Sequence, residues 1–229
     1  YYKLSAPFCI ATASFVSGLD VESSDNTPTG LAFNPTGTKM YVVGKGSDVI
    51  LQYNLSERFS PASASLVYTL STTEESAHAS ASVDNSPEDI HFNPTGTKMF
   101  IVGSQNDEVH QYSMYEPFTL SNATHNFTLS VNSEETSPAG IHLNPTGTKM
   151  FIVGNGHNEV NQYTLSSPFV LSSASHNSAF SINSQENNAR GIAFDYSGKK
   201  MFIIGFTGDD VNVYKLSTPF EISSASFVP

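Results

Sequence analysis

One phrase of eight residues recurs almost unchanged along this chain of 229 residues. Its copies are Phe33–Met40, Phe92–Met99, Leu143–Met150 and, in a looser form, Phe194–Met201. The glycine of the phrase sets the period, because Gly96, Gly147 and Gly198 are spaced 51 residues apart. The first unit is longer, with 59 residues between Gly37 and Gly96. A repeat of this length indicates one supersecondary unit copied along the chain, whose neighbours bury one another's apolar faces.

Each unit predicts four short strands. The first strand precedes the Asn-Pro-Thr-Gly turn, in which proline presets φ and glycine accepts a positive φ. These first strands are expected at Leu31–Phe33, Ile90–Phe92, Ile141–Leu143 and Ile192–Phe194. The second strand, Met-Phe-Ile-Val-Gly, is apolar on both faces and therefore sandwiched between layers. The third, as in Glu159–Leu165, alternates more, and the fourth, from Phe169 through Ser175, is polar enough to be an edge.

Four strands per unit, with polarity that rises outward, predict an all-β fold: a β-propeller with antiparallel four-stranded blades of about 51 residues. We expect residues 1–229 to form a single β-propeller domain or a segment of one, with four full blades and an N-terminal partial blade. The predicted segments are 1–27 for the partial blade and 28–85, 86–136, 137–187 and 188–229 for the full blades. A parallel β-helix is the structural alternative, but its repeats are usually shorter than this one.

The N-terminal segment matches only the second half of a unit. Tyr1–Phe8 aligns with Val213–Phe220, so it supplies the two outer strands of a blade. Three arrangements of the ring are then possible. Four blades can close by themselves, the ring can contain five or more blades, or copies of the chain can join into a larger ring. Open ends would expose apolar inner strands and an unpaired edge. We therefore expect a ring completed by further blades of a longer chain or by self-association.

The repeated Phe-Asn-Pro-x-Gly-Thr-Lys-Met-Phe/Tyr-Val-Val-Gly resembles the repeat of YVTN- and NHL-like propellers, a broad set that includes lactonase-like propellers. The longer phrase, which runs on through residues 162–169, is similar to tandem repeats of predicted secreted and phage-encoded proteins. The resemblance covers nearly the whole chain and implies the architecture. No lactonase catalytic motif maps onto these positions, so the resemblance assigns no catalytic residue.

Composition excludes several partners and favours an extracellular setting. The net charge of −11 argues against nucleic acid, which needs clustered Lys and Arg. No apolar run approaches a membrane span, so membrane insertion is not expected. The single cysteine, Cys9, aligns with Thr119, Val170 and Glu221 and is not expected to be a nucleophile. An acidic, Ser/Thr-rich surface suits an extracellular or virion-surface protein. Three sequons are candidate glycosylation sites: Asn54, Asn122 and Asn126.

Two sets of side chains are candidates for metal binding, each with a simpler explanation. Acidic loops between the second and third strands offer a weak calcium site, made of Asp48, Asp107, Glu108, Glu159, Asp209 and Asp210. Further acidic residues lie in the loops that enter the first strands: Asp20, Glu22, Asp25, Asp84, Glu88, Asp89, Glu134, Glu135 and Glu186. Neither group has the Asp-x-Asp-x-Asp-Gly pattern, and solvated turns are the simpler explanation of both. His91 and His142 occupy equivalent positions on two first strands, where the other units have Ala32 and Ala193. Two histidines make a poor metal site, and hydrogen-bonded histidines near the axis or between blades are the simpler interpretation. We therefore predict no metal and no cofactor.

The sequence contains no Gly-x-Ser-x-Gly, phosphate loop or His-Glu-x-x-His motif. We therefore predict no catalytic residue and a non-enzymatic module for structure or adhesion, which mediates protein–protein assembly or surface attachment. The alternative is lectin-like, multivalent binding of glycans by repeated shallow pockets. The aromatic residues available to face a ligand are Tyr68, Tyr115, Phe127, Tyr196 and Phe206. The eight extra residues of the first unit, around Thr72 to Ala81, form either a longer outer loop or a partner contact.

Overall fold

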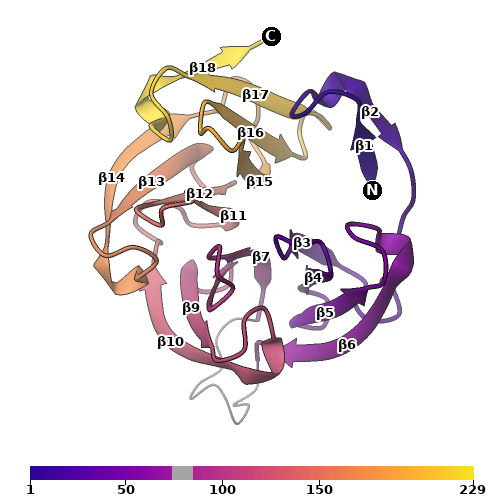
Figure 1. Cartoon of the computed structure of the whole chain (residues 1–229). Helices are drawn as coiled ribbons and strands as arrows, with labels where there is room; N and C mark the ends of the chain where they lie inside the picture. Colours follow the sequence, from indigo (N-terminus) through magenta and orange to yellow (C-terminus); the bar gives the residue numbers. More distant parts are fainter. Residues whose placement is uncertain (74–84) are drawn as a thin grey trace.

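A computed structural model describes residues 1–73 and 85–229 as a ring of β-sheets (Figure 1). Four sheets have four antiparallel strands each, and a fifth sheet has two. The predicted all-β propeller with four full blades and an N-terminal partial blade is therefore confirmed. Most of the extra segment around Thr72 to Ala81, expected to be an outer loop or a partner contact, lies outside the described residues.

The strands follow the repeat. The two-stranded sheet is β1 (Tyr2–Leu4) and β2 (Ala13–Phe15). The first full blade is β3 (Pro28–Phe33), β4 (Lys39–Gly44), β5 (Val49–Leu55) and β6 (Ala64–Ser71). The second is β7 (Pro87–Phe92), β8 (Lys98–Gly103), β9 (Glu108–Met114) and β10 (Ala123–Ser130). The third is β11 (Pro138–Leu143), β12 (Lys149–Gly154), β13 (Glu159–Leu165) and β14 (Ala174–Ser181). The fourth is β15 (Ala189–Phe194), β16 (Lys200–Gly205), β17 (Val211–Leu216) and β18 (Ala225–Val228).

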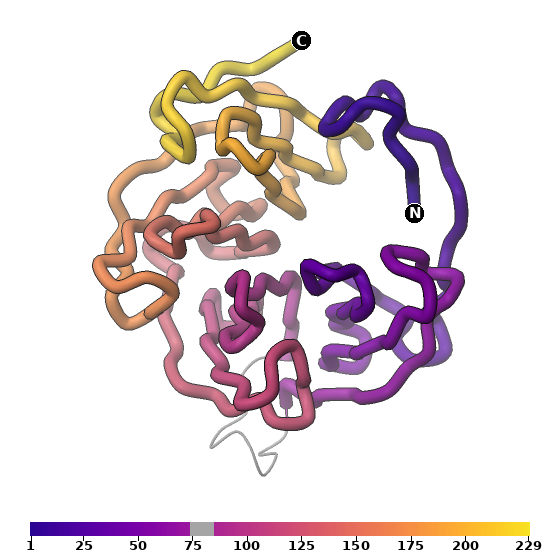
Figure 2. Tube along the Cα trace, viewed as in Figure 1, coloured from indigo at the N-terminus to yellow at the C-terminus, as the bar shows by residue number. Residues whose placement is uncertain are grey.

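The blades are arranged around a central axis. The first strand of each full blade lies nearest the centre and the fourth lies at the rim, as the chain trace shows (Figure 2). The two-stranded sheet β1–β2 lies between the fourth blade and the first, at the N-terminal, indigo end of the trace. The first strands β3, β7, β11 and β15 are therefore the ones that can present side chains to the axis.

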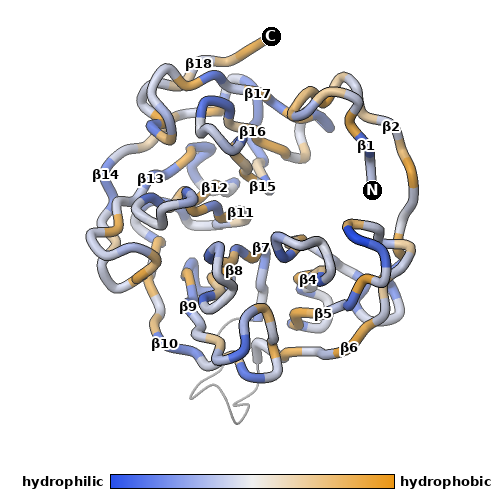
Figure 3. The backbone as a smooth tube through the Cα atoms, viewed as in Figure 1, coloured by the Kyte–Doolittle hydropathy of each residue, from blue (hydrophilic) through white to orange (hydrophobic). Residues whose placement is uncertain are grey.

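The apolar core lies between neighbouring blades. Tyr41 and Val43 of β4 share one cluster with Ile90 and Met99 of the second blade, and all four side chains are buried. Similar clusters join the second blade to the third and the third to the fourth. The outer strands contain more polar residues, as the hydrophilic stretch on β14 shows (Figure 3). Polarity thus rises outward in each blade because only the inner strands are covered on both faces.

The start of the fourth strand differs from the prediction. In the third blade Phe169 does not begin a strand but takes a left-handed backbone conformation, with φ 55°. A 3₁₀ turn, η4 (Leu171–Ser173), follows, and the strand begins at Ala174. The Phe169 N–H donates to the Gly147 carbonyl at 2.9 Å, and its ring covers that glycine so closely that a Cβ there would lie 2.2 Å from the ring. The turn glycine is thus required for both its positive φ and its missing side chain.

The same turns are built in the other blades. The remaining 3₁₀ turns are η1 (Ile10–Thr12), η2 (Pro61–Ser63), η3 (Leu120–Asn122) and η5 (Ile222–Ser224). Polar side chains of one blade hold the corresponding turn of the next. Lys98 donates from Nζ to the Phe169 carbonyl at 2.7 Å, and Gln111 accepts the Leu171 N–H at 2.7 Å. Burial lowers the pKa of Lys98. The lysine of the repeated phrase therefore joins blades rather than serving only as a surface charge.

Candidate active site in the central cavity

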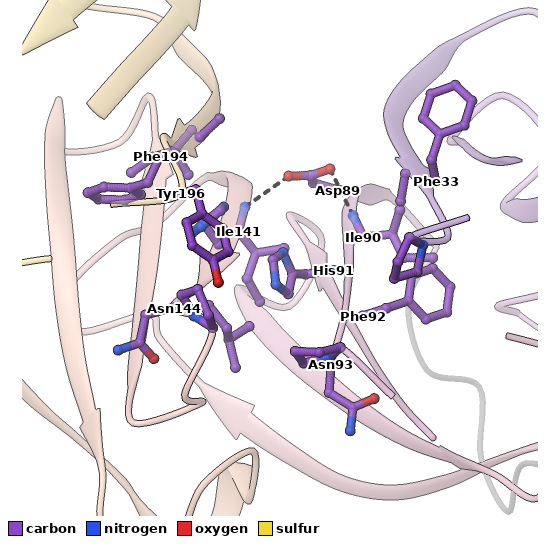
Figure 4. A pocket seen from close by; sticks show the side chains of 18 of the residues that line it. Phe33, Asp89, Ile90, His91, Phe92, Asn93, Ile141, Asn144, Phe194 and Tyr196 are labelled. Carbon is purple, nitrogen blue, oxygen red and sulfur yellow. Dashed lines mark hydrogen bonds between the residues drawn. The ribbon is translucent and has the colours of Figure 1, made fainter. Parts of the chain in front are cut away.

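A cavity of about 590 Å³ lies on the axis of the ring (Figure 4). Residues of the first strand of every full blade line it, together with aromatic residues that follow the third strands. Much of its lining is apolar, with Phe33, Phe92, Phe118, Phe194 and Phe220 among the lining residues. A concave apolar cavity with a few convergent polar groups is the usual form of a small-molecule site.

Asp89 is the ionisable group that departs most clearly from the repeat in this cavity. It pairs with Val102 in the sheet, at the register position that Gly30, Gly140 and Gly191 occupy in the other three full blades. The glycines leave room at the crowded inner rim, where a Cβ on Gly30 would lie 2.8 Å from the Asp89 Cα. Only the second blade therefore presents a carboxyl group at this level of the axis.

The Asp89 carboxyl group bridges two blades. Its Oδ1 accepts the N–H of Ile90 at 2.8 Å, and its Oδ2 accepts the N–H of Ile141 on β11 at 3.0 Å (Figure 4). Burial raises the pKa of Asp89 to about 7, although both hydrogen bonds favour the ionised form, and the nearby Glu88 adds to the increase. At neutral pH this carboxyl group therefore exists in both protonation states.

His91 lies on β7, two residues after Asp89. His142 lies at the equivalent position of β11, two residues after Gly140. Alternate residues of a strand share a face, so His91 is on the same side of β7 as Asp89. The two imidazole rings are 4.9 Å apart in an edge-to-face arrangement. Burial lowers the pKa of His91 to about 4, and burial together with His91 lowers the pKa of His142. Both rings are thus neutral at pH 7, and each offers one N–H donor and one acceptor nitrogen.

These groups provide the elements of acid–base chemistry. A carboxyl group with a pKa near the working pH can both take up and release a proton. Neutral imidazoles can orient a polar substrate by hydrogen bonds, and aromatic rings line the same cavity. The prediction of histidines near the axis or between blades agrees with where the structure places His91 and His142, both in the lining of the axial cavity.

The six acidic residues considered for calcium lie in the loops between the second and third strands of different blades, or at the start of the third strand. Asp107 is buried and has a left-handed backbone conformation, with φ 55°. Its Oδ2 accepts a hydrogen bond from Asn132 Nδ2 at 2.6 Å. In the part of the chain that the structure describes, no group of three or more His, Cys, Asp or Glu side chains is placed to hold a metal ion.

The acidic residues that precede the first strands have a structural role that the sequence did not reveal. Asp25, Glu135 and Glu186 are fully buried instead of solvated. Glu135 Oε1 accepts the N–H groups of Gly156 at 2.7 Å and Ser137 at 3.0 Å. Glu186 accepts the Asn188 N–H at 2.6 Å in the same way. The explanation of solvated turns is therefore wrong for these three, which clamp one loop of a blade to another.

The aromatic residues predicted to face a ligand do not gather in one place. Tyr196 lines the axial cavity and is 85% exposed. Tyr115 and Phe127 are exposed in the second blade, and Tyr68 packs partly against the core. The ring of Phe206 makes a cation–π contact with Arg190, whose guanidinium carbon lies 5.4 Å from the ring centre.

The sequons lie at the surface in different degrees. Asn54 and Asn126 are exposed, and Asn122 is half-buried and accepts the Glu116 N–H at 3.2 Å. Their glycosylation stays a prediction.

Sequence reasoning missed Asp89 as a site residue because it was grouped with the acidic loop residues. The signal was present in the repeat: the other three full units have glycine at this position of the first strand, as at Gly140, and the second unit has aspartate. A charged residue in place of a glycine at a position that faces the axis is the pattern that would have found it.

Comparison with known protein families defines the class. Residues 18–219 match the family described as "Lactonase, 7-bladed beta-propeller". This match spans most of the chain, and the chain therefore belongs to the lactonase seven-bladed propeller family. Comparison with curated protein sequences gives no match.

Solved structures confirm the propeller fold. A protein from Lactobacillus plantarum has a TM-score of 0.58 at 16% identity, over 88% of this chain and 54% of its own. A Bacteroides uniformis protein provisionally named 6-phosphogluconolactonase has a TM-score of 0.57 at 15% identity, over 99% of this chain and 62% of its own. The periplasmic gluconolactonase of Pseudomonas aeruginosa has a TM-score of 0.54 at 13% identity, over 88% of this chain and 52% of its own. The chain thus spans a little more than half the length of these proteins.

Family membership corrects the functional prediction. A lactonase family is a family of enzymes, so the expectations of a non-enzymatic structural or adhesive module, and of a lectin-like one, are wrong. The sequence argument failed because it searched for local motifs, whereas the ionisable groups of the cavity come from more than one blade, as Asp89 and His91 on β7 and His142 on β11 show. In the described residues no helix is long and apolar enough to cross a membrane.

Proposed function

We propose that this chain hydrolyses a small, uncharged lactone in the axial cavity, with Asp89 as the general base. Family membership supports the reaction class, and Asp89 is the observation that carries the assignment of the site. It is the carboxyl group whose pKa burial brings to about 7 in the cavity, at a position where the other full blades have glycine.

The proposed step is the attack of water on the lactone carbonyl carbon. Ionised Asp89 takes a proton from the water as its oxygen bonds to that carbon. The bond from the carbon to the ring oxygen then breaks, and the proton returns from Asp89 to the departing oxygen. The product is a hydroxy acid. The neutral rings of His91 and His142 supply N–H groups to the carbonyl or hydroxyl oxygens of the substrate.

The lining of the cavity favours an uncharged substrate. Among the described lining residues, the charged side chains are the carboxyl groups of Asp89 and Asp195, and no Lys or Arg lies among them. Burial opposes ionisation of Asp195, but hydrogen bonds from Lys200, Ser197 and Lys199 lower its pKa, so it carries a negative charge at neutral pH. A phosphorylated lactone would meet repulsion here, whereas a neutral ring would pack against the phenylalanines. The phosphorylated substrate named for some structural neighbours is therefore not transferred to this chain.

The test uses residues that the repeat itself supplies. Asp89→Gly, His91→Ala and His142→Ala each install the residue of an equivalent position, so folding is expected to survive. Hydrolysis of δ-valerolactone, D-glucono-1,5-lactone and its 6-phosphate is followed by acid release at constant pH. Removal of the general base should lower kcat/KM for the neutral lactones by about 10²–10⁴-fold. Asp195→Asn is the matched control, because it removes the other carboxyl group of the cavity and installs the repeat's asparagine.

The pH profile gives an independent check. Since the base form of Asp89 is required, kcat/KM of the wild type should rise with pH and level off above about pH 7. The residual activity of Asp89→Gly should lack this rise. Equal rates for wild type and Asp89→Gly, or a preference for the phosphorylated lactone, would show that the proposal is wrong.

Two further assignments are proposals that the propeller fold leaves open. We propose that the repeat is of the YVTN/NHL-like type, on the strength of the Asn-Pro-Thr-Gly-Thr-Lys-Met phrase. We also propose that the protein acts outside the cytoplasm. Its acidic, cysteine-poor composition supports this location, and a periplasmic protein is among the structures with the same fold. Fractionation of the native host, with detection by antibody, would test the location.

A further inference from the structure

An ion pair joins the first blade to the second at the residue that precedes Asp89. Lys45, which follows β4, donates from Nζ to Glu88 Oε1 on β7 at 3.0 Å. The Glu88 side chain is 5% exposed and that of Lys45 is 31% exposed. Both positions depart from the repeat, where the equivalents of Glu88 are Thr29, Ala139 and Arg190 and those of Lys45 are Ser104, Asn155 and Phe206. Together with Asp89, three departures from the repeat therefore meet at one interface between blades.

The surroundings of the ion pair hold its two charges in place. Glu88 Oε1 also accepts a hydrogen bond from the Ser104 hydroxyl group at 2.8 Å, and such additional bonds are what a buried ion pair requires. The backbone on both sides is fixed as well. The Lys45 N–H donates to the Thr27 carbonyl at 3.1 Å, and the Ser104 N–H donates to the Ser86 carbonyl at 3.0 Å. The charges of the pair therefore have defined positions beside β7.

Glu88 and Asp89 are consecutive residues with different surroundings. Glu88 contacts Lys45 of the first blade, whereas Asp89 lines the axial cavity (Figure 4). Burial is the main cause of the raised pKa of Asp89, and the negative charge of Glu88 adds to it. Lys45 lies on the other side of the Glu88 carboxylate and carries the opposite charge. The two members of the ion pair thus act on Asp89 with opposite signs.

We propose that Lys45 and Glu88 are positioning residues that set how much of Asp89 is in its base form at neutral pH. Glu88 opposes the ionisation of Asp89, and Lys45 offsets the charge of Glu88. The pair adjusts the group in the cavity from the interface between blades, without contact with a substrate. The kinetic consequence of this inference rests on the proposed function, in which Asp89 is the general base, whereas the effect on the titration of Asp89 does not.

Other ionisable side chains also surround Asp89, on the described first strands and in the cavity lining. His91 on β7 and His142 on β11 are neutral at pH 7, because burial lowers the pKa of each. Asp195 lines the same cavity from the fourth blade. Arg190 lies at the start of β15, with its guanidinium against an aromatic ring, and β3 contributes no ionisable residue. These groups stay the same when the ion pair is altered, so a changed titration of Asp89 can be assigned to the pair.

The test removes each charge separately, in the whole chain. Glu88→Ala and Lys45→Ser both install the residue of an equivalent position, so folding is expected to survive, and circular dichroism checks that it does. Carbon-13 NMR follows the Asp89 carboxyl carbon as a function of pH, and its absence from Asp89→Gly identifies the resonance. Glu88→Ala should lower the midpoint of this titration by at least about half a pH unit, and Lys45→Ser should raise it by a similar amount. Glu88→Gln and Lys45→Met, which keep the size of the side chains, should give the same two shifts.

A matched control breaks an ion pair between other blades. Lys149 of the third blade pairs with Glu221 of the fourth. Glu221→Val removes this pair and installs the residue of an equivalent position, Val170. The midpoint of Asp89 should stay as in the wild type. A shift in the control as large as the one in Glu88→Ala would overturn the proposal, because loosening of any blade interface would then explain both.

Shifts in opposite directions distinguish charge from mere structural support. If the pair only held β7 in place, both variants would admit water to Asp89 and lower the midpoint. Under the proposal, kcat/KM for δ-valerolactone at pH 6 should be about threefold higher in Glu88→Ala than in the wild type and about threefold lower in Lys45→Ser. Equal directions in the two variants, or no shift in either, would overturn the proposal. Opposite NMR shifts without hydrolysis of any lactone would support it and overturn the proposed function instead.

Discussion

Replacement of Gln111 by valine tests whether side-chain contacts between blades hold the ring together. Gln111 lies on β9, and its Oε1 accepts the Leu171 N–H of the next blade at 2.7 Å, in a buried setting. Gln52 and Gln162 make the same contact with Leu120 and Ile222, at 2.8 Å and 3.1 Å. The fourth blade has Val213 at this position, so the repeat already tolerates valine on a third strand.

The expected cost follows from the group left behind. Gln111→Val removes the acceptor but not the donor, so the Leu171 N–H stays buried without its partner. An unsatisfied buried donor costs about 1–3 kcal/mol of unfolding free energy. For a chain of this size each kcal/mol corresponds to about 2–4 °C of melting temperature. A central cost of about 2 kcal/mol therefore lowers Tm by roughly 4–8 °C.

The assay is urea unfolding followed by circular dichroism, with thermal unfolding as a second readout. Gln105→Val is the matched control, because it makes the same chemical change at an exposed loop position. Its effect should stay within about 0.5 kcal/mol. If Gln111→Val destabilises the chain no more than Gln105→Val does, the contacts between third strands and the next turn contribute nothing, and packing alone joins the blades.

Two further predictions concern the turn glycine and the pH dependence of stability. Gly147→Ala should lower the free energy of unfolding by at least about 1–2 kcal/mol because of the left-handed φ, and by more because the new methyl group displaces Phe169. Gly18→Ala is the control: nothing lies within 4 Å of its new methyl group, so it should change little in the same unfolding assay. Burial raises the pKa of Asp89 from 3.8 to about 7, so the folded state keeps a proton that the unfolded chain has lost. This contribution to unfolding free energy is complete below about pH 4 and disappears as pH rises through about 7. Wild type should therefore lose stability relative to Asp89→Gly over this window, and parallel pH curves for the two proteins would contradict the assignment.

The repeat made the architecture predictable because the same buried positions occur in every unit. Met-Phe-Ile-Val-Gly is apolar on both faces, and this alone places it between two layers. The left-handed phenylalanine was not predictable from propensity, since bulky residues rarely adopt positive φ. Tertiary packing decides it: the ring of Phe169 needs the surface that Gly147 leaves open, and that glycine is far away in the sequence.

The candidate site was predictable only in part. The equivalence of His91 and His142 was visible in the alignment of units, and the first-strand position placed them near the axis. Asp89 required knowledge that this position of the first strand lines the axial cavity, and the structure supplies it. The raised pKa has no sequence signal, because it depends on burial by strands from other blades.

Deviations from the repeat therefore have different meanings in different places. Aspartate in place of glycine at position 89 introduces an ionisable group into the cavity that residues of all four first strands line, and the proposed site depends on this one departure. Valine in place of glutamine at position 213 removes the acceptor that Gln52, Gln111 and Gln162 offer to the 3₁₀ turn of the next blade, so the fourth blade lacks this contact between blades.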